Sequence, residues 1–182
     1  MTLHEPIETE DRLAQLLDAL QIDDAVLAAR GLPRQDLART LTLAEVSDAG
    51  TSFYLTPDAA RAWWAMKAAA RLAGLRIELV SAYRSHEEQA ELIARKLRAG
   101  MALQRIFALS APPGYSEHHT GRALDINTDG CAPAEQEFAA TPAFGWLQAH
   151  ARRFGFVLSY PENNASGFVF EPWHWYYVEN LA

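Results

Sequence analysis

The chain has 182 residues, of which 49% are hydrophobic and 21% charged, and its formal net charge is −7. This length predicts one globular domain with a sizeable core, or at most two small ones. The acidic balance disfavours nucleic acid as a partner, because it offers no basic footprint for a phosphate backbone. The single cysteine, Cys131, leaves no internal disulfide and no cysteine-rich zinc site.

The sequence also indicates how the chain relates to a membrane. The longest apolar-rich stretch, residues 59–73, is interrupted by three basic residues and is too short to cross a bilayer. Residues 1–10 contain three glutamates and no apolar run, which is unlike a secretory signal. We therefore expect no transmembrane segment and a monomeric protein. Its compartment stays open between the cytoplasm and, for a mature exported form, the periplasm or cell envelope.

The first 55 residues are predicted to form a helical extension packed on a main domain of residues 56–182. Four leucines between residues 13 and 20 fall at helical spacing, and a weaker helical pattern at 25–29 is ended by Gly31 and Pro33. Because two helices this short are marginally stable alone, we expect their apolar sides to pack on the main domain.

The main domain mixes helices with short strands. Helices are predicted to begin at Thr56-Pro57, at the capping box Ser85–Glu88 and at Thr141-Pro142. Trp63 and Trp64 of the first of these are expected in the core. Strands are expected near residues 75–80, 123–126, 156–160, 167–170 and 174–178. This order predicts an α+β fold with a small central antiparallel sheet flanked by helices.

Reactive side chains are concentrated in residues 81–85, 116–125 and 171–174. His118 and Asp125 would be two turns apart on a straight helix, too far for one metal ion, so the segment must fold back, and Gly121 offers a place to turn. The following strand alternates, with Leu124 and Ile126 on one face and Asp125 on the other. This pattern predicts that Asp125 lies on the floor of a cleft.

A second group of candidates lies near the end of the chain. Glu171 precedes a proline, so it and His174 are expected in an extended turn rather than a helix. Two histidines and an aspartate suit Zn²⁺, and a glutamate three residues from a ligand is placed to take a proton from a water. Spacing alone also permits the alternative that the histidines are structural, and His119 is expected to point away from His118.

The motifs in these stretches resemble one known family. Residues 81–85 with Gln89, residues 113–126, and residues 154–156 through 171–175 resemble the VanY-type D-alanyl-D-alanine carboxypeptidases. These belong to a larger group of zinc peptidases that includes D-Ala-D-Ala dipeptidases and the hedgehog signalling domain. The resemblance spans about residues 57–178 and implies the zinc-binding α+β fold of that group, with residues 56–182 as the catalytic domain.

The resemblance implies roles for individual residues of this chain. It makes His118, Asp125 and His174 the ligands of one Zn²⁺ per chain, and Glu171 the catalytic base. Arg84 would stabilise the oxyanion, and Ser116 and Gln89 would contact the substrate. Ser159 and Tyr176 stand where many members of the family have arginine. Neither is a ligand position, so these two departures concern substrate preference.

The implied function is a carboxypeptidase that removes the C-terminal D-alanine of peptidoglycan stem peptides. Alternatives on the same scaffold are an L,D-carboxypeptidase or an endopeptidase acting on wall peptides. A third alternative is a module without catalytic activity that binds a wall peptide or another partner. The presence of Glu171 and Arg84 beside a full ligand set argues against such a module, since binding alone needs no base.

Overall fold

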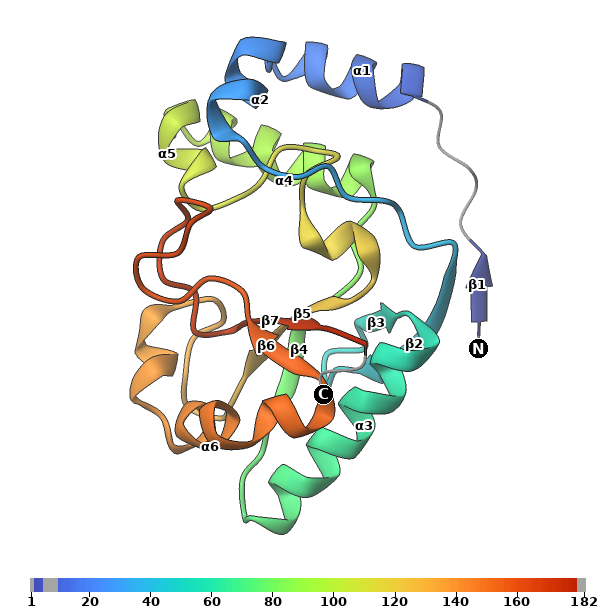
Figure 1. Cartoon of the computed structure of the whole chain (residues 1–182), viewed down its shortest axis with the longest axis vertical. Coiled ribbons are helices and arrows are strands. Elements are labelled where there is room, and N and C mark those ends of the chain that lie inside the picture. The colour runs from blue at the N-terminus through green and yellow to red at the C-terminus, as the bar shows by residue number, and fades with distance from the viewer. Residues whose placement is uncertain (1, 5–9, 180–182) are drawn as a thin grey trace.

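Two antiparallel sheets organise the protein in the computed structural model, which describes residues 2–4 and 10–179 (Figure 1). The first sheet has the order β1 (Thr2–His4), β2 (Thr40–Val46), β3 (Ser52–Leu55). The second has the order β4 (Glu78–Ser81), β5 (Ala123–Asn127), β7 (His174–Tyr177), β6 (Phe156–Leu158). All their strand pairings are antiparallel. The predicted α+β class is therefore confirmed.

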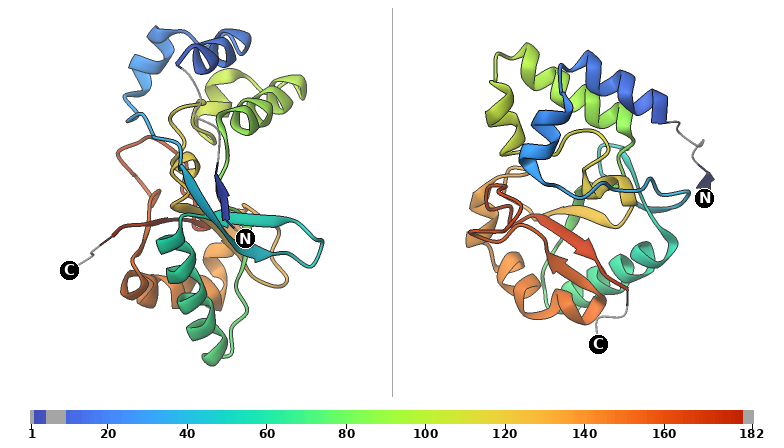
Figure 2. Two further views of the ribbon diagram at one scale, coloured as in Figure 1. Left: turned by 90° about the vertical axis from the view of Figure 1, so that its right-hand side faces the viewer. Right: turned by 45° about the horizontal axis from the view of Figure 1, so that its top comes forward.

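The helices form two groups at opposite ends of the molecule, with the second sheet between them (Figure 1). At one end lie α1 (Glu10–Ala19), α2 (Asp24–Arg30), α4 (His86–Arg98) and α5 (Leu103–Phe107). At the other lie α3 (Pro57–Leu72) and α6 (Pro142–His150), which continues into the 3₁₀ helix η3 (Ala151–Phe154). Two further 3₁₀ helices are η1 (Glu117–Thr120) and η2 (Gln136–Ala140). Figure 2 shows the same separation from two other sides.

The main core lies between α3 and the second sheet. Trp63 and Met66 of α3 are fully buried with Leu124 of β5 and Phe156 of β6. The apolar stripe predicted for this helix is thus confirmed, but Trp64 is 45% exposed and its prediction as a core residue is wrong. One position along a helix turns a side chain by about 100°, which takes Trp64 off the buried face. Its indole instead donates a hydrogen bond to the carbonyl of Ala44.

A second core cluster joins the N-terminal region to α4 and α5. Leu20 and Ile22, which follow α1, are buried with Ile93 of α4 and Ile106 of α5. Helix α4 begins at Ser85 with both hydrogen bonds of the predicted capping box. The two predicted N-terminal helices are present, and α2 ends at Gly31 in the left-handed conformation with φ of 59°. No residue of α2 is fully buried, so partly buried side chains of α1 and α2 that pack on this cluster, rather than helix propensity, stabilise this short pair.

Two local predictions are wrong. The region before residue 56 is not wholly helical, because β2 and β3 occupy Thr40–Val46 and Ser52–Leu55. Leu55 lies in the main core, so this hairpin packs with the rest of the protein. Residues 167–170 form no strand: their backbone is held by Asn164 and by the carbonyl of Ala108. The boundary at residue 55 between extension and catalytic domain stays a prediction.

Within the described part of the chain, no helix has both the length and the apolar character that a membrane crossing requires.

The buried contact between the N-terminal region and α4 can be measured through stability. Ile22 is only 3% exposed, so Ile22→Ala should lower the free energy of unfolding by about 2–5 kcal/mol. Leu72→Ala is the matched control, because Leu72 is 90% exposed and its truncation should change stability by no more than about 0.5 kcal/mol. Urea unfolding curves give both values. Equal, small losses for the two variants would show that the N-terminal region does not contribute to the fold.

Candidate metal centre

Strand register brings two of the predicted ligands together. Strand β5 pairs with β7 so that Asp125 lies opposite His174, and on its other side Asp125 pairs with Ser81 of β4. Directly opposed residues of antiparallel strands have Cβ atoms about 5 Å apart. Two side chains that are 49 positions apart in the sequence therefore reach the same point above the sheet.

A tight turn delivers the third ligand. His118 lies in η1, and Gly121 follows in the left-handed conformation with φ of 62° before β5 begins. A Cβ at Gly121 would lie 3.0 Å from side-chain atoms of both Ala38 and Leu41, so a larger residue is strained by its backbone and crowded by its neighbours. The fold-back predicted from the spacing of His118 and Asp125 is confirmed.

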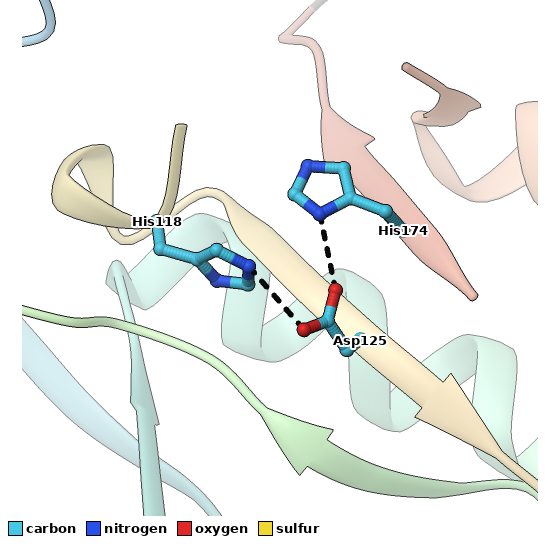
Figure 3. Close-up of side chains that lie close together, drawn as sticks. All are labelled: His118, Asp125 and His174. Carbon is cyan, nitrogen blue, oxygen red and sulfur yellow. Dashed lines mark hydrogen bonds and ion pairs between the residues drawn. The ribbon is translucent and has the colours of Figure 1, made fainter. Parts of the chain in front are cut away.

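The three side chains converge in the interior (Figure 3). His118 Nε2 lies 3.4 Å from one carboxylate oxygen of Asp125, and His174 Nδ1 lies 3.0 Å from the other. One ligand atom from each residue falls within 4.8 Å of the other two, and all three residues are buried. In the part of the chain that the structure describes, no second group of three such residues meets this criterion.

The other nitrogen of each ring is held by the protein. His118 Nδ1 lies 2.7 Å from the carbonyl oxygen of Ala82, and His174 Nε2 lies 2.9 Å from Oε2 of Glu117. Because both partners are acceptors, these nitrogens are the donors. The nitrogens that face Asp125 would offer their lone pairs to a metal that takes the place of any proton they carry. Ligand histidines fixed in this way are typical of zinc sites, so these residues fit a zinc ion.

Charge in this cluster favours a cation. Burial would lower the pKa of His174, but hydrogen bonds to Asp125 and Glu117 raise it to about 10. Burial would raise the pKa of Asp125, but His118 and His174 hold it well below its usual value. Two carboxylates thus stabilise positive charge between these side chains, which is the charge that a divalent ion brings.

Glu171 lies beside the cluster without pairing to it closely. Its Oε2 is 3.9 Å from His174 Nδ1, and its backbone N–H donates to the carbonyl of Tyr160. Burial, with Asp125 and Glu117 nearby, raises the pKa of Glu171 to about 7. A carboxyl group with this pKa exchanges a proton readily near neutral pH, as a general base must. The extended turn predicted for Glu171-Pro172 is confirmed.

Arg84 is a partly buried cation with neutral partners. Its guanidinium donates to Oε1 of Gln89 and to Oγ of Ser81, each at 2.7 Å. Burial lowers the pKa of Arg84, while the charges of Asp125 and Glu171 act to raise it. Among the described residues, no carboxylate lies within ion-pair distance of the guanidinium, so its charge remains directed at the cleft.

The predicted substrate contacts occupy the same cleft but differ in their surroundings. Gln89 holds Arg84 through its oxygen and donates through its nitrogen to the carbonyl of Ala111 at 2.6 Å. Both ends of its amide are thus engaged with the protein, which makes it a support for Arg84. Ser116 is buried immediately before η1 and lines the cleft next to His118.

These residues share one cleft of about 620 Å³. Its lining includes the predicted site residues Ser116, His118, Asp125, Glu171, His174, Arg84 and Gln89. Side chains that sequence reasoning did not place there include Lys96, Tyr160, Phe168 and Trp173. Apolar walls with a few convergent polar groups are the usual composition of a small-molecule site.

Glu117 is a further residue that sequence reasoning missed, and it gives Ser159 a part in the site. The Oγ of Ser159 donates to Oε2 of Glu117 at 2.6 Å, and the same oxygen accepts from His174. The position of Glu117 directly before His118 in the motif was the signal that could have indicated its role. Tyr176 pairs with Ala123 of β5 and Val157 of β6 and lies two residues beyond His174 on β7, so it shares a face of the sheet with His174 without being one of the predicted ligands.

The comparison with known families decides between the interpretations of this cluster. A family model described as "VanY: D-alanyl-D-alanine carboxypeptidase" matches residues 52–180. The chain belongs to the VanY family. This confirms the resemblance read from the sequence motifs, and the match begins within β3, after most of the N-terminal region.

Curated and solved relatives agree with this membership. The bifunctional D-Ala-D-Ala dipeptidase and carboxypeptidase VanXYC of Enterococcus gallinarum is 35% identical over 76% of this chain and 73% of its own length. The solved L,D-carboxypeptidase LdcB has 30% identity and a TM-score of 0.64, over 81% of this chain and 67% of its own. A VanY mutant from a VanB-type resistance cassette, solved with Zn(II), has 29% identity and a TM-score of 0.61, over 81% and 83%.

Length separates this chain from some relatives. It spans 48% of the length of the Bacillus subtilis protein YodJ, to which it is 33% identical over 71% of this chain.

His119, the neighbour of the predicted ligand His118, points away from the cluster as expected. Its Nδ1 donates to the carbonyl of Arg84 at 2.7 Å, and its Nε2 accepts from the N–H of Gly114 at 3.1 Å. Only the neutral ring satisfies both contacts, since protonated Nε2 cannot accept. Burial lowers the pKa of His119 to about 3. The ring therefore ties two loops of the cleft together in its uncharged form.

This burial predicts a pH-dependent stability. In the unfolded chain a histidine binds its proton near pH 6.5, whereas folded His119 binds it near pH 3. Between these values the unfolded state holds more protons, so stability should fall with falling pH by up to about 1.4 kcal/mol per unit. His119→Gln, which has a donor and an acceptor but no titration, should show a shallower slope between pH 6 and 4. Urea unfolding of the zinc-free proteins measures both slopes, and identical slopes would contradict the assignment.

Proposed function

We propose that this protein is a zinc-dependent carboxypeptidase that removes the C-terminal D-alanine from peptidoglycan stem peptides. The observation that carries the proposal is the buried His118–Asp125–His174 cluster with Glu171 beside it in an open cleft. Membership of the VanY family, with a zinc-bound member of the same fold, supports both the metal and the reaction class. We further propose that the protein acts as a monomer.

The chemistry follows from where each side chain lies. Zinc held by His118, Asp125 and His174 would supply Lewis acidity toward a water and the scissile carbonyl. Glu171 accepts the proton of the attacking water and later donates it to the leaving amine, for which a pKa of about 7 is well suited. Arg84, held by Gln89 and Ser81, keeps a fixed positive charge for the developing oxyanion.

One alternative has specific support. LdcB, a neighbour of the same fold, is an L,D-carboxypeptidase by name, as is DacB of Streptococcus pneumoniae at 31% identity and a TM-score of 0.59. The two activities share the reaction and differ in the stereochemistry of the residue before the scissile bond. The departures at Ser159 and Tyr176 fall outside the ligand set, so they affect this choice rather than the chemistry. An endopeptidase or a binding module without catalytic activity has no comparable support in the site.

The substrate preference can be determined from the masses of muropeptides before and after incubation with the protein. We expect zinc-loaded protein to remove one alanine from purified muropeptides that end in D-Ala-D-Ala, with no loss from tetrapeptide muropeptides. Mass spectrometry before and after incubation records both reactions. Loss from the tetrapeptide alone would replace the D,D assignment with the L,D alternative. Cleavage within a cross-link would indicate an endopeptidase.

The proposed roles of base and ligand separate in two variants. Glu171→Ala should retain about one zinc per chain and lose turnover by about 10²–10⁴-fold, the usual contribution of a general base. His174→Ala should lose both zinc and turnover, because a ligand is removed. Elemental analysis and steady-state kinetics on a D-Ala-terminated peptide measure these effects. Glu162→Gln is the matched control, because Glu162 is exposed and does not line the cleft, and it should change neither value.

Two outcomes would contradict these roles. Wild-type turnover in Glu171→Ala would remove Glu171 as the base. Loss of zinc from Glu171→Ala as complete as from His174→Ala would make it a fourth ligand of a structural site.

A further inference from the structure

Helix α4 forms one wall of the cleft. Gln89, Leu92 and Lys96 all line it. They are separated by three and four positions, so they lie along one face of the helix. The side chain nearest the N-terminus of α4, Gln89, already belongs to the site because it holds Arg84. This wall of the cleft therefore extends from Gln89, beside Arg84, to Lys96.

Lys96 is a half-buried cation with a neutral partner. Its ammonium donates to Oγ of the buried Ser110 at 2.7 Å, and that hydroxyl donates in turn to the carbonyl of Leu109. Among the described residues, no carboxylate lies within ion-pair distance of Lys96, unlike Lys67, which is 2.7 Å from Glu45. An ammonium that is partly removed from water and has no carboxylate at ion-pair distance gains from an anion that enters the cleft.

Two adjacent residues hold Lys96 and Gln89, the residue that supports Arg84. Ser110 accepts from Lys96, and the next residue, Ala111, accepts from Gln89 at 2.6 Å. The residue that holds the Lys96 ammonium is thus the chain neighbour of the residue that holds the Gln89 amide, and this amide positions the Arg84 guanidinium. Burial lowers the pKa of Lys96; the charge of Glu171 acts to raise it and that of Arg84 to lower it further. The ammonium therefore lies within the electrostatic field of both residues. Two cations stand in sequence along one wall.

A carboxypeptidase substrate carries two negative groups at this point of the reaction. One is the oxyanion that develops at the scissile carbonyl, and the other is the carboxylate one residue farther on, where Cα atoms are about 3.8 Å apart. Arg84 lies in the field of Asp125 and Glu171, next to the proposed metal, and suits the oxyanion. Arg105 also lines the cleft but is exposed, where water weakens its attraction.

We propose that Lys96, held by Ser110, binds the C-terminal carboxylate of the peptide substrate. This inference rests on the proposed carboxypeptidase function and adds a residue that selects chain ends over internal peptide bonds. An internal bond has a neutral amide where the carboxylate would be, so its binding leaves the ammonium without a partner.

Binding, measured without turnover, tests the assignment. Isothermal titration calorimetry on zinc-loaded Glu171→Ala protein compares a peptide ending in D-Ala-D-Ala with its C-terminal carboxamide. Adding Lys96→Met should weaken binding of the free acid by about 10- to 100-fold, the usual range for a hydrogen bond between charged groups. The affinity for the carboxamide should stay unchanged. Lys96→Arg, which keeps the charge, should restore part of the loss.

Arg95→Met is the matched control, since Arg95 is an exposed cation of the same helix and the charge change is the same. It should leave the affinity for both peptides unchanged. Equal weakening of acid and carboxamide by Lys96→Met, or no weakening of the acid, would overturn the assignment. Binding of neither peptide by the Glu171→Ala parent would overturn it together with the proposed substrate. If the acid binds but wild-type protein releases no D-alanine, only the proposed function fails, and the ratio of the two affinities still decides the role of Lys96.

Discussion

The site depends on the register between β5 and β7. Asp125 faces His174 across these strands, and a slip of one residue would turn Asp125 toward the core, where Leu124 and Ile126 now pack. The apolar residues of β5 are therefore as important to the metal cluster as the ligands themselves. Burying Leu124 and Ile126 fixes which face of the strand carries the carboxylate, and that choice places it between the two imidazoles.

The N-terminal region supports the loop that carries His118, although the family match begins at residue 52. The N–H of Ala38 donates to the carbonyl of His119, and that of Gln35 to the carbonyl of Gly114. Leu41 and Ala38 pack so closely on Gly121 that any side chain there would be crowded as well as strained by the backbone. Residues before β3 thus act on the site through backbone contacts and packing, which sequence motifs do not record.

Much of the fold and most of the candidate site could be predicted from the sequence because their signals are local. The capping box at Ser85, the proline-started helix α3 and the alternation in β5 each lie within a few residues. What was missed depends on tertiary contacts. The strands β2 and β3 form because Leu41 and Leu55 are fully buried, and the role of Glu117 depends on a bond to His174, 57 residues away. Lys96 reads from sequence as one more helical surface charge, and only its place on the cleft wall distinguishes it.

The departures from the family pattern can be understood through charge. Glu117 accepts from both Ser159 and His174, and a serine at residue 159 holds this carboxylate without bringing a positive charge to it. An arginine at that position would add a positive charge close to the His174 ring, which is a predicted ligand of the proposed metal. With serine there, the carboxylate's charge acts on His174, and the partly buried cations that line the cleft are Arg84 and Lys96. Residues outside the predicted ligand set can therefore differ without removing a ligand, and we expect relatives with different peptide preferences to diverge at such positions.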